Sequence, residues 1–545
     1  MYQFSGKLKI FAFALMILGV LGTAISFMSA PKSLEEAKEI IAKQEAAHHG
    51  GHGENHAEEG HDGGNTSHNT EEHSETKKSS HEAGEANHED GSHKDDSHSD
   101  ALKENHSDTS NVASTHKKDS EDHSTNAHVE DHNPTKADNS SIHGSDHAVS
   151  SAHSDNHHDD HHAEHLYHQM KNRPVSAFYV SLLFFLGITL LVLAFYAGQR
   201  IAHAGWSVVL FRVMEAITAN LHYVSIVMLV FIILTAMHSF HLFPWMAEGV
   251  FDPTSPNYDP IVDGKKWWMN LPGWTIRSVF YLVIWNGYRF LIRRNSIKQD
   301  NGDLKLHKRN YNMSVAFVLL FMITESMASW DWIMGIDPHW FSTLFGWYVL
   351  ATFLVSALTV ICLVTIYLRS KGHLPLVNDS HIHDLAKFMF GFSVFWTYLW
   401  FAQFMLIWYA DMPEETTYFV QRFNEYKVPF LGMVVLNFIF PVLILINSDF
   451  KSIPWVIAIA GVFILVGHYV DLFVMIMPGT VGGQWGFGIG EISGFLFFLG
   501  LFIFATFNAF AKAPPVPKGN PFLHESETHH YYVIEHRGED NNAHH

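Results

Sequence analysis

The chain has 545 residues, a formal net charge of −20, a hydrophobic fraction of 47% and a single cysteine, Cys362. One cysteine excludes an intrachain disulfide, a haem attachment through paired cysteines and an iron–sulfur cluster held by the chain's own thiolates. The whole net charge lies between residues 48 and 165, which hold 27 acidic, 7 basic and 24 histidine residues. The acidity therefore describes that segment and not the rest of the chain.

Residues 1–30 are expected to form a first transmembrane helix. Lys7 and Lys9 precede an apolar stretch at 10–29, which is long for the apolar part of a signal peptide. The exit at 27–31 is a poor cleavage site because Met28 stands among the small residues that cleavage requires. We therefore expect a retained helix.

Residues 31–170 are expected to form a disordered, His-rich, acidic linker. After a short amphipathic helix at 35–47, the segment has too few apolar side chains to offset the entropy of ordering it. Local clusters such as His157, His158, His161 and His162 could bind Zn²⁺, Ni²⁺ or Cu²⁺ weakly. Histidines scattered among Ser, Asp and Gly define no coordination geometry, so we favour a solvated tether and predict no metal site.

Nine further apolar segments follow, each near or above the roughly 20 residues that cross a 30 Å hydrocarbon core. They lie at 175–197, 208–240, 271–292, 312–334, 343–367, 385–409, 429–447, 454–477 and 488–510. The 208–240 segment exceeds what a bilayer needs and is expected to tilt or to begin at the interface. The pattern predicts an all-α polytopic membrane protein with about ten transmembrane helices.

Basic residues in the short loops predict the orientation, because such residues favour the cytoplasmic side. With the N-terminus in the cytoplasm, one set of loops holds Arg200, Arg289, Arg293, Arg294, Lys298, Lys305, Lys308, Arg309, Arg369, Lys371 and Lys451, followed by Lys512 and Lys518. The opposite loops are mainly acidic, although Lys265 and Lys266 run against the trend. Both termini are therefore predicted to be cytoplasmic, and the linker periplasmic.

Ionisable residues inside the spans are candidates for function, since a charged group at the bilayer centre costs about 2.5–3.5 kcal/mol on insertion scales. They are Arg212, Glu215, His222, Glu325, Asp331, Asp384, Lys387, His468 and Asp471. Arg212–Glu215 and Asp384–Lys387 have the spacing of ion pairs that only neutralise each other. Glu325 and the His468–Asp471 pair have no basic residue nearby in sequence, which favours a functional role.

His238 and His241, three residues apart, end the long segment close to Phe240, Phe243 and Trp245. An aromatic belt with interfacial histidines accounts for this pattern. Haem ligation by His222, His238, His241 or His468 is the alternative, but the small residues that would face a porphyrin are not evident.

Four motifs resemble those of the ActF subunit of bacterial alternative complex III. They are ESMASWDWIMGIDPHWFSTLFGW at 325–347, NDSHIHDLAKFMFG at 378–391, FWTYLWFAQFM at 395–405 and NSDFK at 447–451. The resemblance covers essentially the whole chain, including the first helix and the linker. It implies a bacterial inner-membrane protein with two NrfD-like four-helix bundles, at 171–340 and 341–480, plus two peripheral helices, the second within 481–545.

The resemblance also implies partners and cofactors. The partners are an ActC-like paralogous membrane subunit, iron–sulfur and haem c subunits, and a cytochrome c oxidase. Quinol or menaquinol is the small molecule of such a complex, whereas the haem c groups and iron–sulfur clusters belong to the partner subunits. We expect no cofactor bound by this chain itself, no catalysis by the chain alone and no nucleic-acid partner.

Three hypotheses for function follow. In the first, Glu325, Asp331, His468 and Asp471 line an outer proton half-channel, and Arg212, Glu215, His222, Asp384 and Lys387 an inner one, because such groups suit proton relay. In the second, His238, His241 and Asp331 hold a quinol. In the third, the chain is a scaffold that docks the terminal oxidase or the haem subunits.

Overall fold

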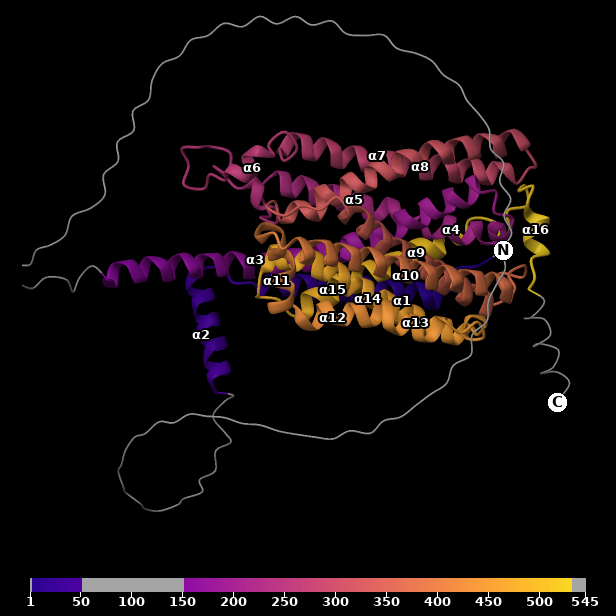
Figure 1. The fold of residues 1–545 in the computed structure, drawn as a ribbon. Helices are drawn as coiled ribbons and strands as arrows, with labels where there is room; N and C mark the ends of the chain where they lie inside the picture. Colours follow the sequence, from indigo (N-terminus) through magenta and orange to yellow (C-terminus); the bar gives the residue numbers. More distant parts are fainter. Residues whose placement is uncertain (1, 51–150, 532–545) are drawn as a thin grey trace, which may run out of the picture. The chain divides into compact units, whose positions relative to one another are not determined.

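The computed structural model describes residues 2–50 and 151–531, and within these ranges all regular secondary structure is helical (Figure 1). The helices are α1 Gly6–Met28, α2 Leu34–Gly50, α3 Ser151–Ile201, η1 Gly205–Leu210, α4 Phe211–Ile217, α5 Asn220–Ala236, η2 Pro244–Met246, α6 Pro260–Gly264, α7 Leu271–Gln299, α8 Leu304–Trp332, η3 Met334–Ile336, α9 Phe345–Ser370, α10 Asp379–Ala410, α11 Pro413–Asn424, α12 Lys427–Val434, η4 Val435–Ile439, α13 Phe440–Leu445, η5 Phe450–Ser452, α14 Pro454–Val481, α15 Ile489–Phe510 and α16 Leu523–Glu527.

Nine helical segments in the described ranges are long and apolar enough to cross a membrane. The tenth predicted segment, 271–292, is helix α7, whose arginines lower its apolar character. Its 29 residues extend about 43 Å at 1.5 Å per residue, and α7 packs along α8 for most of that length (Figure 1). The prediction of an all-α polytopic membrane protein is confirmed, and we treat α7 as a tenth crossing.

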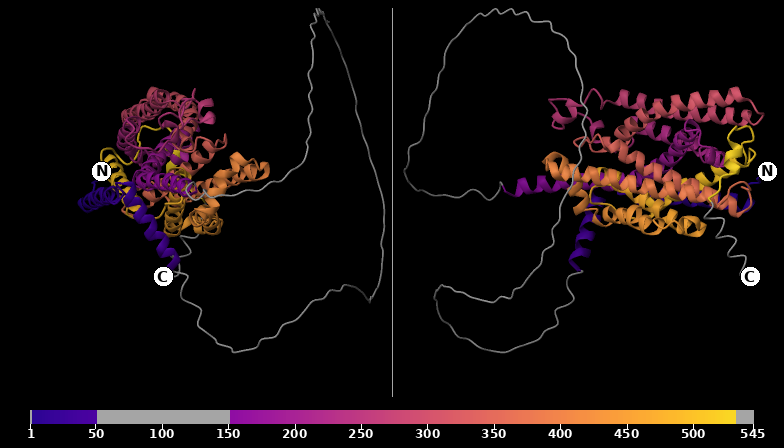
Figure 2. Two further views of the ribbon diagram at one scale, coloured as in Figure 1. Left: turned by 90° about the vertical axis from the view of Figure 1, so that its left-hand side faces the viewer. Right: turned by 45° about the vertical axis from the view of Figure 1, so that its right-hand side comes forward.

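The crossing helices pack in two groups. The first contains α3, α4 with α5, α7 and α8, and the second contains α9, α10, α12 with α13, and α14. Helix α3 lies between them, in contact with α8 of the first group and with α9 and α14 of the second (Figure 2). All described helices belong to one compact unit, and the predicted division into bundles at 171–340 and 341–480 stays a prediction.

Helices α1 and α15 form a peripheral pair held together by small residues. A Cβ atom on Gly19 would lie 2.5 Å from the backbone nitrogen of Phe497, and one on Gly500 would lie 2.6 Å from the carbonyl oxygen of Ala12. Glycine is therefore needed at both positions for the two backbones to approach this closely. The other face of α1 exposes a row of large apolar side chains, as a lipid-facing helix does.

The two ends of the helical unit differ in charge. The end that we call the basic end holds both termini of the described chain, since the ring of Tyr2 contacts the rings of His373 and Phe510. The α3–η1, α7–α8 and α9–α10 turns lie at the same end (Figure 1). The opposite end, the acidic end, holds the α5–α7 loop, the α8–α9 turn and α11. The predicted orientation, with the basic end in the cytoplasm, stays a prediction.

Helices occupy both described ends of the segment predicted as a linker at 31–170. Residues 34–50 form α2, which includes the expected amphipathic helix at 35–47, and α3 begins at Ser151, well before the membrane-crossing part that starts at Leu166. Helix α2 packs against α3, which stabilises this extension. Residues 51–150 lie outside the described residues, as do the side chains of His157, His158, His161 and His162.

Candidate functional site

The carboxylate of Asp471 lies at the centre of the second group and is completely buried. It accepts hydrogen bonds from the hydroxyls of Tyr348 and Thr352 on α9 and from the indole nitrogen of Trp396 on α10, the last two at 2.8 and 2.9 Å. Nδ1 of His468, one turn earlier on α14, lies 3.6 Å from Asp471 Oδ2. Three donors fix the carboxylate in place, and the imidazole stands beside it.

The imidazole of His468 has no hydrogen-bond partner on either ring nitrogen, although the side chain is completely buried. Its neighbour Asn437 is likewise buried with both amide atoms unpartnered. Asn437 lies in η4, a single π-helical turn between α12 and α13, and its oxygen occupies the place that a Cβ atom on Gly467 would take. Buried polar groups without partners are uncommon and require water or a transient ligand.

Two small cavities, each of about 10 Å³, lie between Asp471 and Asp337. Asp471 lines the first and Asp337 the second, and both cavities share Tyr418, Arg422 and Met475. A cavity needs roughly 10–15 Å³ to hold one water molecule. The two cavities therefore have room for about one water each along a line from Asp337 to Asp471.

Arg422 lies between the two cavities and is 2% exposed. Its guanidinium stacks over the ring of Tyr418 and donates to the carbonyl oxygens of Tyr418 and Val474, at 2.7 and 3.2 Å. These acceptors are neutral, so the positive charge of Arg422 is balanced only at longer range by Asp337 and Asp471.

Helix α10 adds further unpartnered polar atoms along the same face, on Ser393, Trp400 and Gln403. Toward the basic end the face changes character, because Leu385, Ala386 and Met389 are buried and apolar. The next polar side chains on α10 in that direction are Lys387 and Asp384, six and nine residues before Ser393, about 9 and 13 Å along the helix axis. On α10, the buried face is therefore polar from Ser393 toward the acidic end and apolar at Leu385, Ala386 and Met389.

Glu325 lies in the first group, on the side that faces α9. Both carboxyl oxygens are buried without a partner, in a cavity of about 30 Å³ whose lining is almost entirely apolar. Residues of α3, α8 and α9, among them Leu183 and Phe353, line this cavity. The cost of burying an unpaired negative charge favours the protonated carboxyl here.

Asp331 is held in an ion pair near the acidic end. Arg277 of α7 donates to both carboxylate oxygens, at 2.7 and 2.9 Å, and Tyr281 donates at 2.9 Å. The guanidinium of Arg277 also stacks on Trp268. Asp331 is thus neutralised by a residue that sequence reasoning did not single out.

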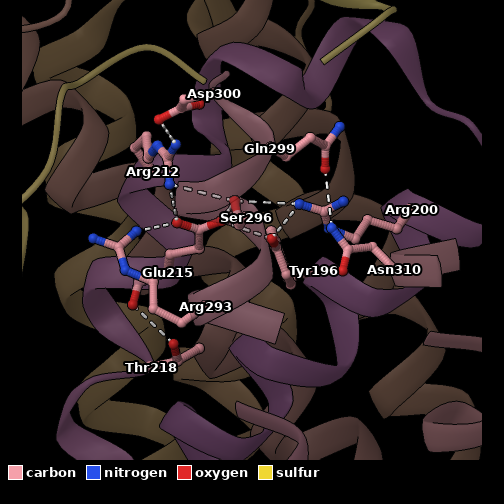
Figure 3. A network of polar contacts seen from close by, with 10 residues as sticks. All are labelled: Tyr196, Arg200, Arg212, Glu215, Thr218, Arg293, Ser296, Gln299, Asp300 and Asn310. Carbon is pink, nitrogen blue, oxygen red and sulfur yellow. Dashed lines mark hydrogen bonds and ion pairs between the residues drawn. The ribbon is translucent and has the colours of Figure 1, made fainter. Parts of the chain in front are cut away.

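Glu215 is the centre of a network at the basic end of the first group (Figure 3). It accepts from Arg212 and Tyr196, at 2.8 and 2.7 Å, and also from Arg293 and Ser296. Arg212 forms a second ion pair with Asp300 at 2.5 Å. The i,i+3 pair that the sequence indicates is real, and it is part of a larger cluster of arginines.

Asp384 and Lys387 form the expected ion pair, at 3.2 Å, at the basic end of the second group. The C-terminal segment covers them: His529 lies 2.8 Å from Asp384, and Tyr531 donates to Asp384 at 2.7 Å. His222 belongs to neither cluster and bridges Asn286 and Arg289 of α7.

The residues proposed for a quinol do not form one cluster of contacts. His238 and His241 are exposed in the loop after α5, whereas Asp331 is buried beneath Arg277 and Tyr281. Partial burial of its ring, and then the nearby His168, Lys171 and His238, lower the pKa of His241 from its ordinary value.

The candidate residues therefore fall in several separate places. His468 and Asp471 lie together, Glu325 lies on the other side of α9, and Asp331 is sealed by Arg277. Sequence reasoning missed Tyr348, Thr352, Trp396, Arg422 and Asn437, which surround the His468–Asp471 pair. Of these, only Arg422 could have been noticed in the sequence, because it is a charged residue four positions after Tyr418. Tyr348, Thr352, Asn437 and Trp396 look like ordinary members of apolar spans.

The fold and this site define an all-helical, multi-pass integral membrane protein. The sequence matches no known protein-family model and no curated protein.

Proposed function

We propose that this chain is a proton-conducting membrane subunit of a quinol-oxidising respiratory complex of the alternative complex III kind. The observation that carries the proposal is the buried His468–Asp471 pair, set among unpartnered polar groups, with two water-sized cavities between Asp471 and Asp337. Such groups are expensive inside a membrane and are found where ions or protons move.

His468 is the group that takes up and releases the proton in this proposal. Asp471 is held by three donors and stays in place, whereas both ring nitrogens of His468 are free of hydrogen bonds. The neighbouring carboxylate of Asp471 stabilises the imidazolium ion. Protonation of His468 would convert the 3.6 Å approach into a charged hydrogen bond.

Arg422 sets the electrostatics of the route toward the acidic end. A proton passing the two cavities meets a fixed positive charge that is flanked by the carboxylates of Asp337 and Asp471. The two carboxylates lower the electrostatic barrier that a proton meets on either side of Arg422. The positive charge of the guanidinium repels any further cation that enters the route. Since the buried face of α10 is apolar near Met389, transfer across the whole membrane needs a second conformation in which this apolar region opens.

The wider setting is also part of the proposal. It consists of a bacterial inner membrane with both termini in the cytoplasm, an ActC-like subunit, iron–sulfur and haem c subunits, and a terminal oxidase. Quinol oxidation would occur on partner subunits, and this chain would couple it to proton movement. A quinol near His238, His241 and Asp331 and a purely structural role remain the alternatives.

The test is proton release by the purified complex in sealed liposomes. We expect Asp471→Asn and His468→Gln to lower proton release per electron by at least about tenfold while cytochromes and assembly stay normal. Glu325→Gln is the matched control, because Glu325 lies in a separate cavity on the other side of α9. Comparing it with the other two variants separates a route through His468 and Asp471 from one through Glu325. Unchanged proton release in both second-group variants would refute this role, and loss of assembly in all variants would favour the scaffold.

A further inference from the structure

Arginines outnumber carboxylates at the basic end of the first group. Four guanidinium groups lie there, and the carboxylates that form ion pairs with them are Glu215 and Asp300. The four are Arg200, Arg212, Arg289 and Arg293, linked by hydrogen bonds or electrostatic contact to Glu215 or to one another. This part of the molecule therefore carries an excess of positive charge.

Of the four arginines, Arg289 is one that forms no ion pair with a carboxylate in the described residues. Its Nη1 lies 2.6 Å from Nε2 of His222, and a guanidinium only donates, so Nε2 accepts. The ring proton is then on Nδ1, which donates to the oxygen of Asn286 at 2.6 Å, while the Asn286 nitrogen donates to Ser225. His222 is thereby fixed as a neutral tautomer, and the buried Nε of Arg289 has no partner.

The position of Arg289 along α7 matches the level of lipid phosphates. Trp267, exposed just before α7, marks the interface at the acidic end. A 30 Å core takes about 20 residues, so the opposite boundary falls near residue 290. Arg289 is therefore at the inner boundary, where a long side chain reaches the headgroups.

The surface beside Arg289 is apolar and exposed on both helices. On α7, Val283 and Phe290 are 62% and 56% exposed, and on α5, Ile226 is 61% exposed. Each lies within about one turn of a member of the Arg289–His222–Asn286 chain. A ligand that contacts Arg289 from outside thus meets a cation and an apolar face together.

We infer that Arg289 binds the phosphate of an anionic phospholipid whose acyl chains lie along the exposed faces of α5 and α7. Nε is buried and Nη1 donates to His222, so the other terminal nitrogen, Nη2, is the group that donates to a phosphate oxygen. The positive charge of Arg289 favours an anionic headgroup over a zwitterionic one. The exposed apolar side chains of α5 and α7 favour a lipid over free phosphate. The inference is independent of proton conduction.

The test uses the full-length chain in detergent and native mass spectrometry, with phosphatidylglycerol, phosphatidylethanolamine and inorganic phosphate offered in turn. We expect phosphatidylglycerol to be retained at roughly tenfold lower concentration than phosphatidylethanolamine, and phosphate not to displace it. Arg289→Gln should abolish most of this preference. Arg309→Gln, the same charge change at an exposed site on α8, should keep it. If Arg289→Gln does not fold, Arg289→Lys should keep the anionic preference but weaken it several-fold.

Three results would overturn the inference: equal retention of both lipids by the unaltered chain, equal effects of Arg289→Gln and Arg309→Gln, or displacement of the lipid by inorganic phosphate. A second measurement applies to the intact complex in native membranes, with benzoylphenylalanine in place of Phe290. A phospholipid adduct supports the lipid site. An adduct formed only with another protein would overturn it and identify a subunit contact.

Discussion

Buried acids in this protein differ in whether donors reach them. Asp331, Asp471 and Glu215 each accept three or more hydrogen bonds, whereas Glu325 accepts none. A carboxylate with strong donors is part of the structure, because removing it leaves a buried partner unpaired. A carboxyl without donors contributes little to stability and is available for chemistry.

Asp331→Asn should therefore be strongly destabilising and Glu325→Gln nearly neutral. The first leaves Arg277 without a carboxylate, which costs about 3–5 kcal/mol for a buried pair, and the second should change stability by less than about 1 kcal/mol. Cys362 is completely buried, so its reaction with a maleimide dye on heating reports unfolding. Equal unfolding temperatures for the two variants would contradict this reading of the two sites.

The loop after α5 should lose stability as the pH falls below about 6.5, the ordinary pKa of histidine. The pKa of His241 is lowered in the folded protein by burial and by His168, Lys171 and His238, so the unfolded state binds its proton more tightly. The stability contribution is full above pH 6.5 and declines as the pH falls toward the folded pKa.

Limited proteolysis at Lys265 and Lys266, at pH 7.5 and pH 5, measures this effect. The chain has many histidines, so the relevant quantity is the difference between the unaltered chain and His241→Gln, which should show a weaker pH dependence. An identical pH response in both would mean that His241 is not the group responsible.

At the residue scale, the charged candidate residues could be identified from the sequence, but the side chains that contact them could not. The spacing of Arg212 and Glu215 predicts their ion pair, and His468 and Asp471 were correctly placed on one helix face. The partners of Asp331 and Asp471 come from other helices, and Tyr348, Thr352 and Arg277 carry no sequence signal for those contacts. Packing between helices decides them.

At the scale of single elements, interruptions of helices mark the site. The π-helical turn η4 places Asn437 against Gly467, and only glycine leaves room for the amide there. Extra residues in a helix are tolerated where they serve function. Sequence reasoning placed a continuous span at 429–447 and did not foresee the turn, because no proline or glycine stands inside 435–439.

Asn437→Leu should keep or raise stability by up to about 1–3 kcal/mol, because it removes a buried amide without partners. In the proposed route the same change should slow proton release, since the amide packs against Gly467, the residue before His468. Unfolding temperature and proton release in liposomes are measured on the same preparation. Lower stability with normal proton release would show that the amide has a structural partner instead.

The α1–α15 pair should separate when its close contact is blocked. Gly19→Ile introduces atoms against the backbone of Phe497 and should cost about 1–3 kcal/mol. The hydroxyls of Thr23 and Ser493 lie 3.2 Å apart, so a Thr23→Cys, Ser493→Cys pair should form a disulfide that Gly19→Ile suppresses. Gly6→Ala, which meets nothing nearby, is the control.

At the scale of the whole molecule, the C-terminal segment connects the two groups of helices. In the first group, Gly519 accepts from Gln299, and Ser526 bonds to Trp206 and Val209. In the second, residues 529–531 bond to Asn378, Ser380 and Asp384. The order of the nine crossing candidates in the described ranges could be predicted from apolar length alone, whereas this C-terminal segment, polar and short, gave no sign of its role.

Truncation after Lys518 should lower the stability of the whole helical unit by at least about 2 kcal/mol, since several hydrogen bonds worth about 1 kcal/mol each are lost. It should also broaden the unfolding transition, because the groups would unfold less cooperatively. Tyr531→Phe, which removes one hydroxyl, should cost about 1 kcal/mol or less. A truncated chain with unchanged dye reactivity of Cys362 would contradict the connecting role.

The same segment has a consequence for biogenesis. Residues 519–531 are synthesised after every crossing helix described above, and they bind turns that were made much earlier. The basic end therefore reaches its final packing only after residue 531 has emerged from the ribosome. A chain stalled before residue 519 leaves Asp384 and Lys387 without the cover of His529 and Tyr531, which marks the unfinished subunit by an exposed polar pair.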